Sequence, residues 1–283
     1  MPRPILMAIW LIVGPPSRLV PGSYCSIAMD VFRSSEAVDH LISVARCPIM
    51  VDCLTGRTPD HPCADLVLSQ WPKEVPVEAR AQAWPRWHQL PEPWAGHLRT
   101  APLLFVASNP GYAGKPIPVD GLDGRASDHI TTWERDDSEI TRRRITALGD
   151  AALNAVPYWR DTHPRAVEAF GREVNPGVDY ALTEAARCKS KDETVGVASA
   201  RNVCARNYLH ATILLSGARV VLGMGVHARE ALGRVLKPLD DGKTDNFFET
   251  VIGPRRFLVG LLPHPGAHIP IEKKTLAYNL EKR

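Results

Sequence analysis

The stretch LLFVASNPG, residues 103–111, is an apolar run that stops at an Asn-Pro-Gly turn. A run of this length, bounded by turn residues, predicts a buried β-strand that ends in a tight turn. Further strands are predicted from YALTEAARC (residues 180–188), ARVVLGMG (218–225) and RFLVGLLPHPG (256–266). Two of the four predicted strands therefore run directly into a proline-containing loop.

Helical patterns alternate with these strands. Residues 30–50 predict a helix that runs into Cys47, and Gly196–Ser216 carries apolar residues at helical spacing. Further helices are predicted over residues 137–156, 226–236 and 270–282, whereas the Pro- and Trp-rich residues 51–100 predict extended, irregular packing. The alternation predicts a three-layer α/β/α fold with a central, mostly parallel four-stranded sheet. Ligands of such sheets bind beyond the carboxyl ends of the strands.

The bulk composition is that of an ordinary globular chain. It has 283 residues, 45% of them hydrophobic, a formal net charge of +3 and six cysteines. This charge neither demands nor excludes nucleic acid as a partner. The cysteine spacing does not suggest a secreted disulfide framework, so we expect a cytoplasmic protein.

The N-terminus carries an apolar run, ILMAIWLIV, at residues 5–13. The run is too short for a membrane-spanning helix, which needs about 20 residues. It has the length of the apolar part of an export signal, but Gly14-Pro15-Pro16 breaks it and no clean cleavage site follows. Residues 1–28 are predicted to be an extension, either a misplaced start or an export signal. Residues 29–283 are predicted to form a single domain, monomeric and without a membrane partner.

Two of the loops after predicted strands present a polar side chain from a proline-fixed turn. Asn109 stands in Ser-Asn-Pro-Gly, and His264 stands in Leu-Pro-His-Pro-Gly. Such rigid placement is what a group that positions water or stabilises a leaving group requires. Each motif alone also fits an ordinary turn.

Together, in this order and on these elements, VASNPGY and LPHPGA resemble the two signature loops of the uracil-DNA glycosylase superfamily. Between them, TEAARCKSK and ARVVLGMGVHAREAL are similar to the thermostable family of that superfamily, which holds an iron–sulfur cluster. The resemblance implies an enzyme that flips a base out of DNA and hydrolyses its glycosidic bond. It implies that Asn109 positions the attacking water and that His264 hydrogen-bonds O2 of the departing base. Neither loop contains a lysine, so we expect a monofunctional glycosylase.

The resemblance also implies a 4Fe–4S cluster held by four thiolates. The implied ligands are Cys47, Cys53, Cys188 and Cys204, with Cys63 as a possible substitute. The first two are separated by five residues, where the family usually has two. A zinc site also fits four thiolates, and buried cysteines that only fill space are a third interpretation.

The identity of the base is predicted from one departure from the family. Uracil-cutting members carry an Asn four residues before the third cysteine, and this chain carries Glu184 there. An ionised carboxylate only accepts hydrogen bonds, so it would repel O4 of uracil and accept from the N4 amine of cytosine. Ser108 and Gly111 are predicted to line the pocket, and Tyr112 or Trp133 to stack on the base.

Because removal of normal cytosine would be toxic, the predicted substrate is a modified cytosine. The hydroxymethylated or glucosylated cytosine of phage DNA is one such base, and its removal would make this an antiphage defence enzyme. If Glu184 points elsewhere, a general repair glycosylase for uracil or deaminated bases is the alternative. A non-catalytic iron–sulfur protein that binds nucleic acid is the alternative of another class.

Basic residues surround the second loop in the sequence. Arg255 and Arg256 precede it, Pro265 belongs to it, and Lys273 and Lys274 follow it. These five residues are predicted to contact DNA, where cations meet phosphates. Short basic clusters are also common on solvated faces that bind nothing.

Overall fold

A computed structural model of the chain describes residues 35–87, 90–111, 157–190, 195–239 and 246–281. Its centre is a five-stranded sheet in the order β2-β1-β3-β5-β4. The strands are β1 (Leu103–Ala107), β2 (Tyr180–Glu184), β3 (Val220–Met224), β4 (Phe247–Ile252) and β5 (Arg255–Leu262). The predicted residues 1–28, the helix over 137–156, Tyr112 and Trp133 lie outside the described residues.

The α/β class and the four predicted strands are confirmed. Every residue of β1, β2 and β3 is buried, because these apolar strands pair in parallel and are covered on both faces. The predicted count of four is wrong, since β4 runs antiparallel beside β5. β4 alternates buried and exposed residues, as an edge strand does, and Gly253 (φ 58°) makes the turn into β5.

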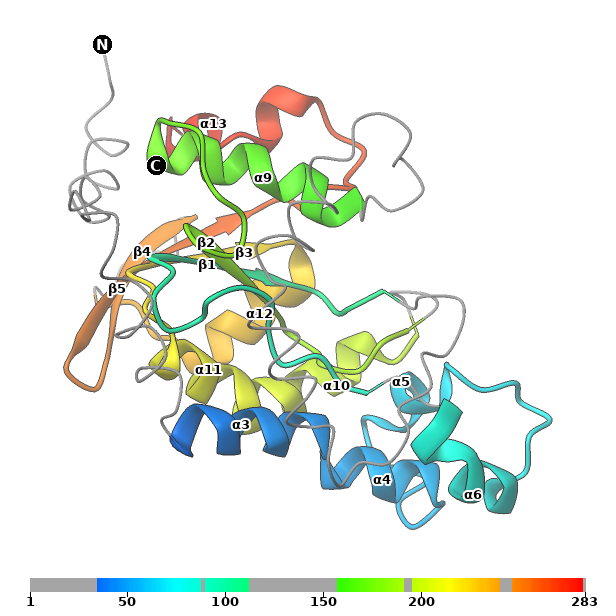
Figure 1. Cartoon of the computed structure of the whole chain (residues 1–283). Coiled ribbons are helices and arrows are strands. Elements are labelled where there is room, and N and C mark those ends of the chain that lie inside the picture. The colour runs from blue at the N-terminus through cyan, green and yellow to red at the C-terminus, as the bar shows by residue number, and fades with distance from the viewer. Residues whose placement is uncertain (1–34, 88–89, 112–156, 191–194, 240–245, 282–283) are drawn as a thin grey trace.

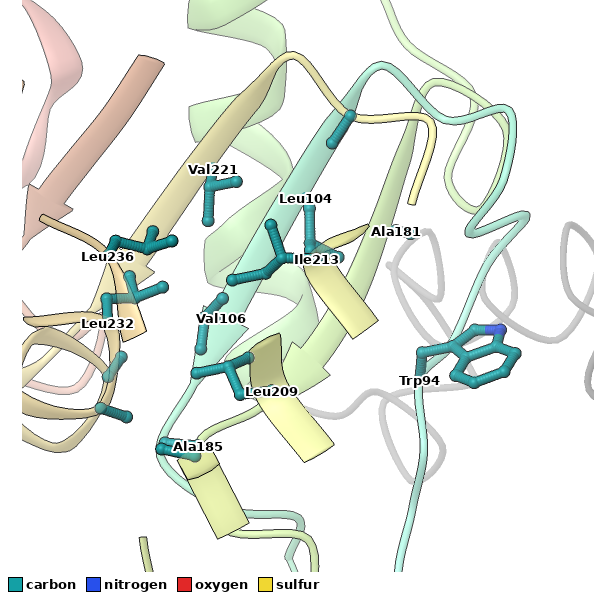
Figure 2. Close-up of a cluster of buried hydrophobic side chains, with 14 of the residues drawn as sticks. Trp94, Leu104, Val106, Ala181, Ala185, Leu209, Ile213, Val221, Leu232 and Leu236 are labelled. Carbon is teal, nitrogen blue, oxygen red and sulfur yellow. The ribbon is translucent and has the colours of Figure 1, made fainter. Parts of the chain in front are cut away.

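One face of the sheet is covered by α3 (Ser35–Ala45), α10 (Val197–Cys204), α11 (His210–Leu215) and α12 (Val226–Val235). A π-helical turn, η1 (Ala205–Leu209), joins α10 to α11, so the predicted helix over Gly196–Ser216 is confirmed with one wider turn in it. Apolar side chains from these helices pack on the sheet: Leu209, Ile213 and Leu232 meet Leu104 and Val221 (Figure 2).

The opposite face is covered by α9 (Pro157–Phe170) and α13 (Leu276–Glu281), which lie side by side in Figure 1. The backbone N–H of Leu276 donates to Glu168 Oε2 at 2.8 Å and ties α13 to α9. A short 3-10 helix, η2 (Ile271–Lys274), precedes α13, so the predicted C-terminal helix is divided in two.

Residues 51–100 are more helical than predicted. They complete α4 (Pro48–Leu54) and include α5 (Ala64–Leu68) and α6 (Val77–Trp87). The helices α4 and α5 are too short to be stable in isolation. Tertiary packing stabilises them, because Met50, Leu54 and Leu66 are fully buried. Irregular chain does follow, and Ala95 in it pairs with Leu182 of β2.

Candidate active site and cysteine cluster

The carboxyl ends of four strands lie at one edge of the sheet, and a candidate site residue stands at or just after each of these ends. Asn109 follows β1, Glu184 ends β2, Gly225 follows β3 and His264 follows β5. In the sheet order, β3 lies between β1 and β5. Neighbouring strands are about 4.8 Å apart, so the ends of β1 and β5 are separated by roughly 10 Å. The two predicted catalytic loops are thus brought to either side of a site at the carboxyl edge.

The side-chain amide of Asn109 is held in one orientation. Its Nδ2 donates to the carbonyl oxygen of Pro110 at 3.1 Å and to Ser190 Oγ at 2.8 Å. Because a carbonyl only accepts, the atom beside it must be the NH₂ group. The loops after β1 and β2 are also joined by their backbones, since Ser190 N donates to Pro110 O at 3.3 Å. The amide oxygen, the atom expected to hold water, takes part in neither side-chain bond.

The imidazole of His264 is fixed by its own loop. The backbone N–H of Gly266 donates to Nδ1 at 3.0 Å, so a neutral ring carries its proton on Nε2. Gly225 permits the ring to lie where it does, because a Cβ there would be 3.1 Å from His264 Cβ and Cδ2. Gly225 also has a φ of 93°, which favours glycine. His264 is therefore oriented as a hydrogen-bond donor through Nε2.

The other predicted pocket residues lie at the same edge. Glu184 is buried and lines a small hollow together with Glu92, Trp94 and Thr183. Ser108 is buried, and its carbonyl accepts from Ala186 N at 2.9 Å, so it joins the two loops. Gly111 is exposed, and within the described residues nothing lies within 4 Å of a Cβ built on it.

Arg255 and Arg256 do not flank the His264 loop, and that part of the prediction is wrong. They begin β5, whereas His264 follows its end, so the strand separates them by about 25 Å. Arg255 donates to the carbonyls of Leu214, Ser216 and Ala218. It therefore closes the end of α11, while Arg256 pairs with Glu249 at 3.1 Å on the surface.

The residues after His264 remain at the site. Pro265 is buried, and its carbonyl accepts from Lys274 Nζ at 2.5 Å. Lys274 therefore braces the loop, whereas Lys273 is exposed on η2. Of the predicted DNA contacts, only Pro265, Lys273 and Lys274 lie beside the candidate active site.

Five cysteines gather in one buried cluster beside α4, α5 and α10. The members of this cysteine cluster are Cys47, Cys53, Cys63, Cys188 and Cys204. All five are free thiols and buried. Gly196 allows the close approach of α10 to α5, because a Cβ there would be 2.4 Å from Leu66 N. Cys47 and Cys204, the first and last of these cysteines, are about 157 residues apart in the sequence.

Cys63 and Cys53 differ in the contacts that their thiols make within the cysteine cluster. The Cys63 thiol is hydrogen-bonded to Cys204, a contact that raises the pKa of Cys63 and lowers that of Cys204 to about 7. Cys63 also interacts electrostatically with Cys188 and Cys47. Cys53 interacts electrostatically with Cys47 and Cys188 as well, and its Sγ lies 3.7 Å from Thr58 Oγ1. The thiol contact with Cys204 is the observation that favours Cys63 over the predicted Cys53 as the fourth ligand.

A fully buried cation adjoins these thiols. The guanidinium of Arg187 donates to the carbonyl of Pro93 and to the hydroxyls of Thr183 and Thr212, all of them neutral groups. Burial lowers the pKa of Arg187 to about 10, against the opposing attraction of Cys204 and Glu184. A buried charge is costly unless an opposite charge compensates it. Glu184 supplies one negative charge, and thiolates bound to a metal centre would supply more.

The residue types gathered here, five thiols beside the buried cation Arg187, have the chemistry of a thiolate-bound metal group. Within the described ranges, no three His, Cys, Asp or Glu side chains are arranged so that they could hold a single metal ion. The 4Fe–4S cluster and the zinc alternative both stay predictions.

Three residues of the site were missed in the sequence. Ser190 stands in Lys-Ser-Lys, Gly225 in Gly-Met-Gly, and Arg187 directly before a predicted ligand. Only Arg187 carried a signal, since a charged residue inside a buried segment calls for a partner. The roles of Ser190 and Gly225 depend on contacts between loops that are far apart in sequence.

No protein-family model matches the chain, and no curated protein matches it. The described helices include none that is long and apolar enough to cross a membrane.

Proposed function

We propose that this protein is a monofunctional DNA glycosylase that hydrolyses the N-glycosidic bond of a flipped base. The proposal rests on the orientation of the Asn109 and His264 side chains, which follow the strands on either side of β3. The amide NH₂ of Asn109 is engaged by Pro110 and Ser190, and Nδ1 of His264 is engaged by Gly266. A water-holding oxygen and a donating N–H are the two groups that this reaction needs.

Cleavage of the glycosidic bond places positive charge on the sugar and negative charge on the base. His264 Nε2–H donates to O2 of the base as that charge grows, which is electrostatic stabilisation by a pre-positioned donor. Asn109 holds the attacking water through its amide oxygen. An amide is no strong base, so it orients the water rather than deprotonating it, and the rate depends on the reactivity of the sugar cation.

Glu184 supports a cytosine-type base. It ends β2 beside the paired residue Ala107 of β1, at the same edge as Asn109. Glu184 and the buried Arg187 attract each other electrostatically. A carboxylate accepts from the N4 amine of cytosine and repels O4 of uracil. The proposed substrate is therefore a modified cytosine, with the hydroxymethylated or glucosylated base of phage DNA as the case to test.

The cysteine cluster would hold a 4Fe–4S cluster through Cys47, Cys63, Cys188 and Cys204. Such a group, when bound, supplies a structural anchor of negative charge. In this chain it would tie α4, α5 and α10 to the end of β2, where Glu184 and Ser190 lie. We assign it no part in the bond cleavage.

The test is an alkali-induced strand-break assay on two DNAs, one containing uracil and one containing hydroxymethylated and glucosylated cytosine. Wild type, Asn109→Ala and Glu184→Asn are compared, with iron content measured in each. Breaks in the modified DNA with wild type, lost in Asn109→Ala, are expected, and Glu184→Asn should gain uracil cleavage. Breaks by wild type in the uracil DNA alone would favour general repair. Intact DNA in all samples would favour a protein that only binds nucleic acid.

A further inference from the structure

Ser190 lies where the loop after β2 meets the loop after β1. It is 4% exposed, and its backbone pairs with Gly111 in a parallel bridge. Its Oγ is 2.8 Å from Asn109 Nδ2, across 81 residues of sequence. The side chain that holds Asn109 therefore comes from the loop that follows β2, the strand that ends at Glu184.

We propose that Ser190 is a positioning residue that sets the orientation of the Asn109 amide, an inference that rests on the proposed function. The NH₂ group has two hydrogens, and the carbonyl of Pro110 takes one of them at 3.1 Å. Because Pro110 directly follows Asn109, this hydrogen bond restrains the side-chain amide only through its own loop. Ser190 Oγ takes the other hydrogen and constrains the plane from the opposite loop.

With both hydrogens engaged, the amide oxygen has one allowed direction. Rotation of the amide by half a turn would place that oxygen against the Pro110 carbonyl, two acceptors in contact, which is repulsive. Loss of the Ser190 hydroxyl removes one of the two restraints and leaves an N–H of Asn109 without its acceptor. Water would then be held in a less productive position, although Asn109 itself remains.

The experiment measures single-turnover release of the base by wild type, Ser190→Ala, Ser190→Thr, Asn109→Ala and the double variant. Ser216→Ala is the matched control, because Ser216 is 2% exposed and its Oγ donates to Ile213 O at 2.7 Å, away from the site. One lost hydrogen bond predicts a rate lowered about tenfold in Ser190→Ala, with substrate affinity unchanged. Ser190→Thr should restore the rate, since it keeps the hydroxyl.

The double variant decides how Ser190 acts. If it acts through Asn109, adding Ser190→Ala to Asn109→Ala leaves the rate unchanged. An equal loss in both backgrounds, or a wild-type rate in Ser190→Ala, overturns the role of Ser190 alone. No base release by the wild type from either DNA overturns the proposed function and this role with it. Melting temperatures and iron content of all variants identify any loss that is due to folding.

Discussion

The proposed catalytic edge, which carries Asn109 and His264, and the cysteine cluster are held by different kinds of contact. Asn109 and His264 are each bonded to the backbone one or two residues further along their own loop. The five cysteines are held by the packing of α4, α5 and α10 on the end of β2. Damage to the first region should therefore change the reaction and leave the fold intact, whereas damage to the second should change the fold first.

The largest effect is expected from the cysteine cluster. Cys63→Ser should lose most of its bound iron and more than about 4 kcal/mol of unfolding free energy, since a metal group that binds only the folded chain adds to stability. Cys53→Ser is the matched control and should keep its iron, because Cys63 rather than Cys53 contacts Cys204. Iron assay, visible absorption and denaturant unfolding measure this. Iron loss in Cys53→Ser alone would restore the ligand set predicted from the sequence.

Arg187 joins the two regions, and its removal should damage both. Arg187→Met takes away the buried cation and leaves the negative charge beside it uncompensated, at an expected cost of about 3 kcal/mol in unfolding free energy. Arg256→Met removes a surface cation and should cost less than about 0.5 kcal/mol. Chemical denaturation of the two variants compares them. Equal stability of Arg187→Met and wild type would contradict the assignment of a charged centre at the cysteines.

The catalytic edge should respond in rate alone. His264→Ala should lower the single-turnover rate by about 10²- to 10³-fold, the usual cost of one lost donor to a developing anion, with melting temperature unchanged. The exposed His268, four residues along the same segment, provides the control variant His268→Ala. A His264→Ala enzyme as fast as that control would remove His264 from the mechanism.

The smallest effect concerns His40, which shares the hydroxyl of Thr212 with Arg187. Burial, and then the cation of Arg187, lower the pKa of His40 from 6.5 to about 4. Between those values the unfolded chain binds a proton that the folded chain does not. The free energy of unfolding is therefore not reduced by this group above pH 6.5, and it decreases by about 1 kcal/mol per pH unit as the pH falls toward 4. His40→Gln, which can keep the bond to Thr212 Oγ1, should flatten this slope in urea unfolding between pH 7 and 5. An unchanged slope would show that another group titrates.

The sequence was informative where the contacts are local. The apolar run of β1 and its Asn-Pro-Gly stop predicted the strand, its carboxyl end and the place of Asn109. The edge strand β4 was missed, because its six residues, FFETVI, form a short run that is interrupted by Glu249 and Thr250. Arg255 and Arg256 were assigned to the site because they are near His264 in the chain, although a strand of eight residues lies between them.

The contacts that cross between elements could not be predicted. Cys63 lies beside Cys204, and α5 packs on α10 at Gly196, a contact that the spacing of the cysteines does not reveal. Ser190 reaches Asn109 only because β2 lies next to β1. The sequence-based predictions therefore placed Asn109 and His264 directly after β1 and β5 and left open what holds their side chains.

The measurement that tests the central claim most directly is mass spectrometry of the small molecules released from phage DNA that carries modified cytosine. The account predicts free modified base in the wild-type reaction, and none with Asn109→Ala. Release of nucleotides, of uracil alone from a uracil control, or of nothing from DNA that the protein binds would contradict it.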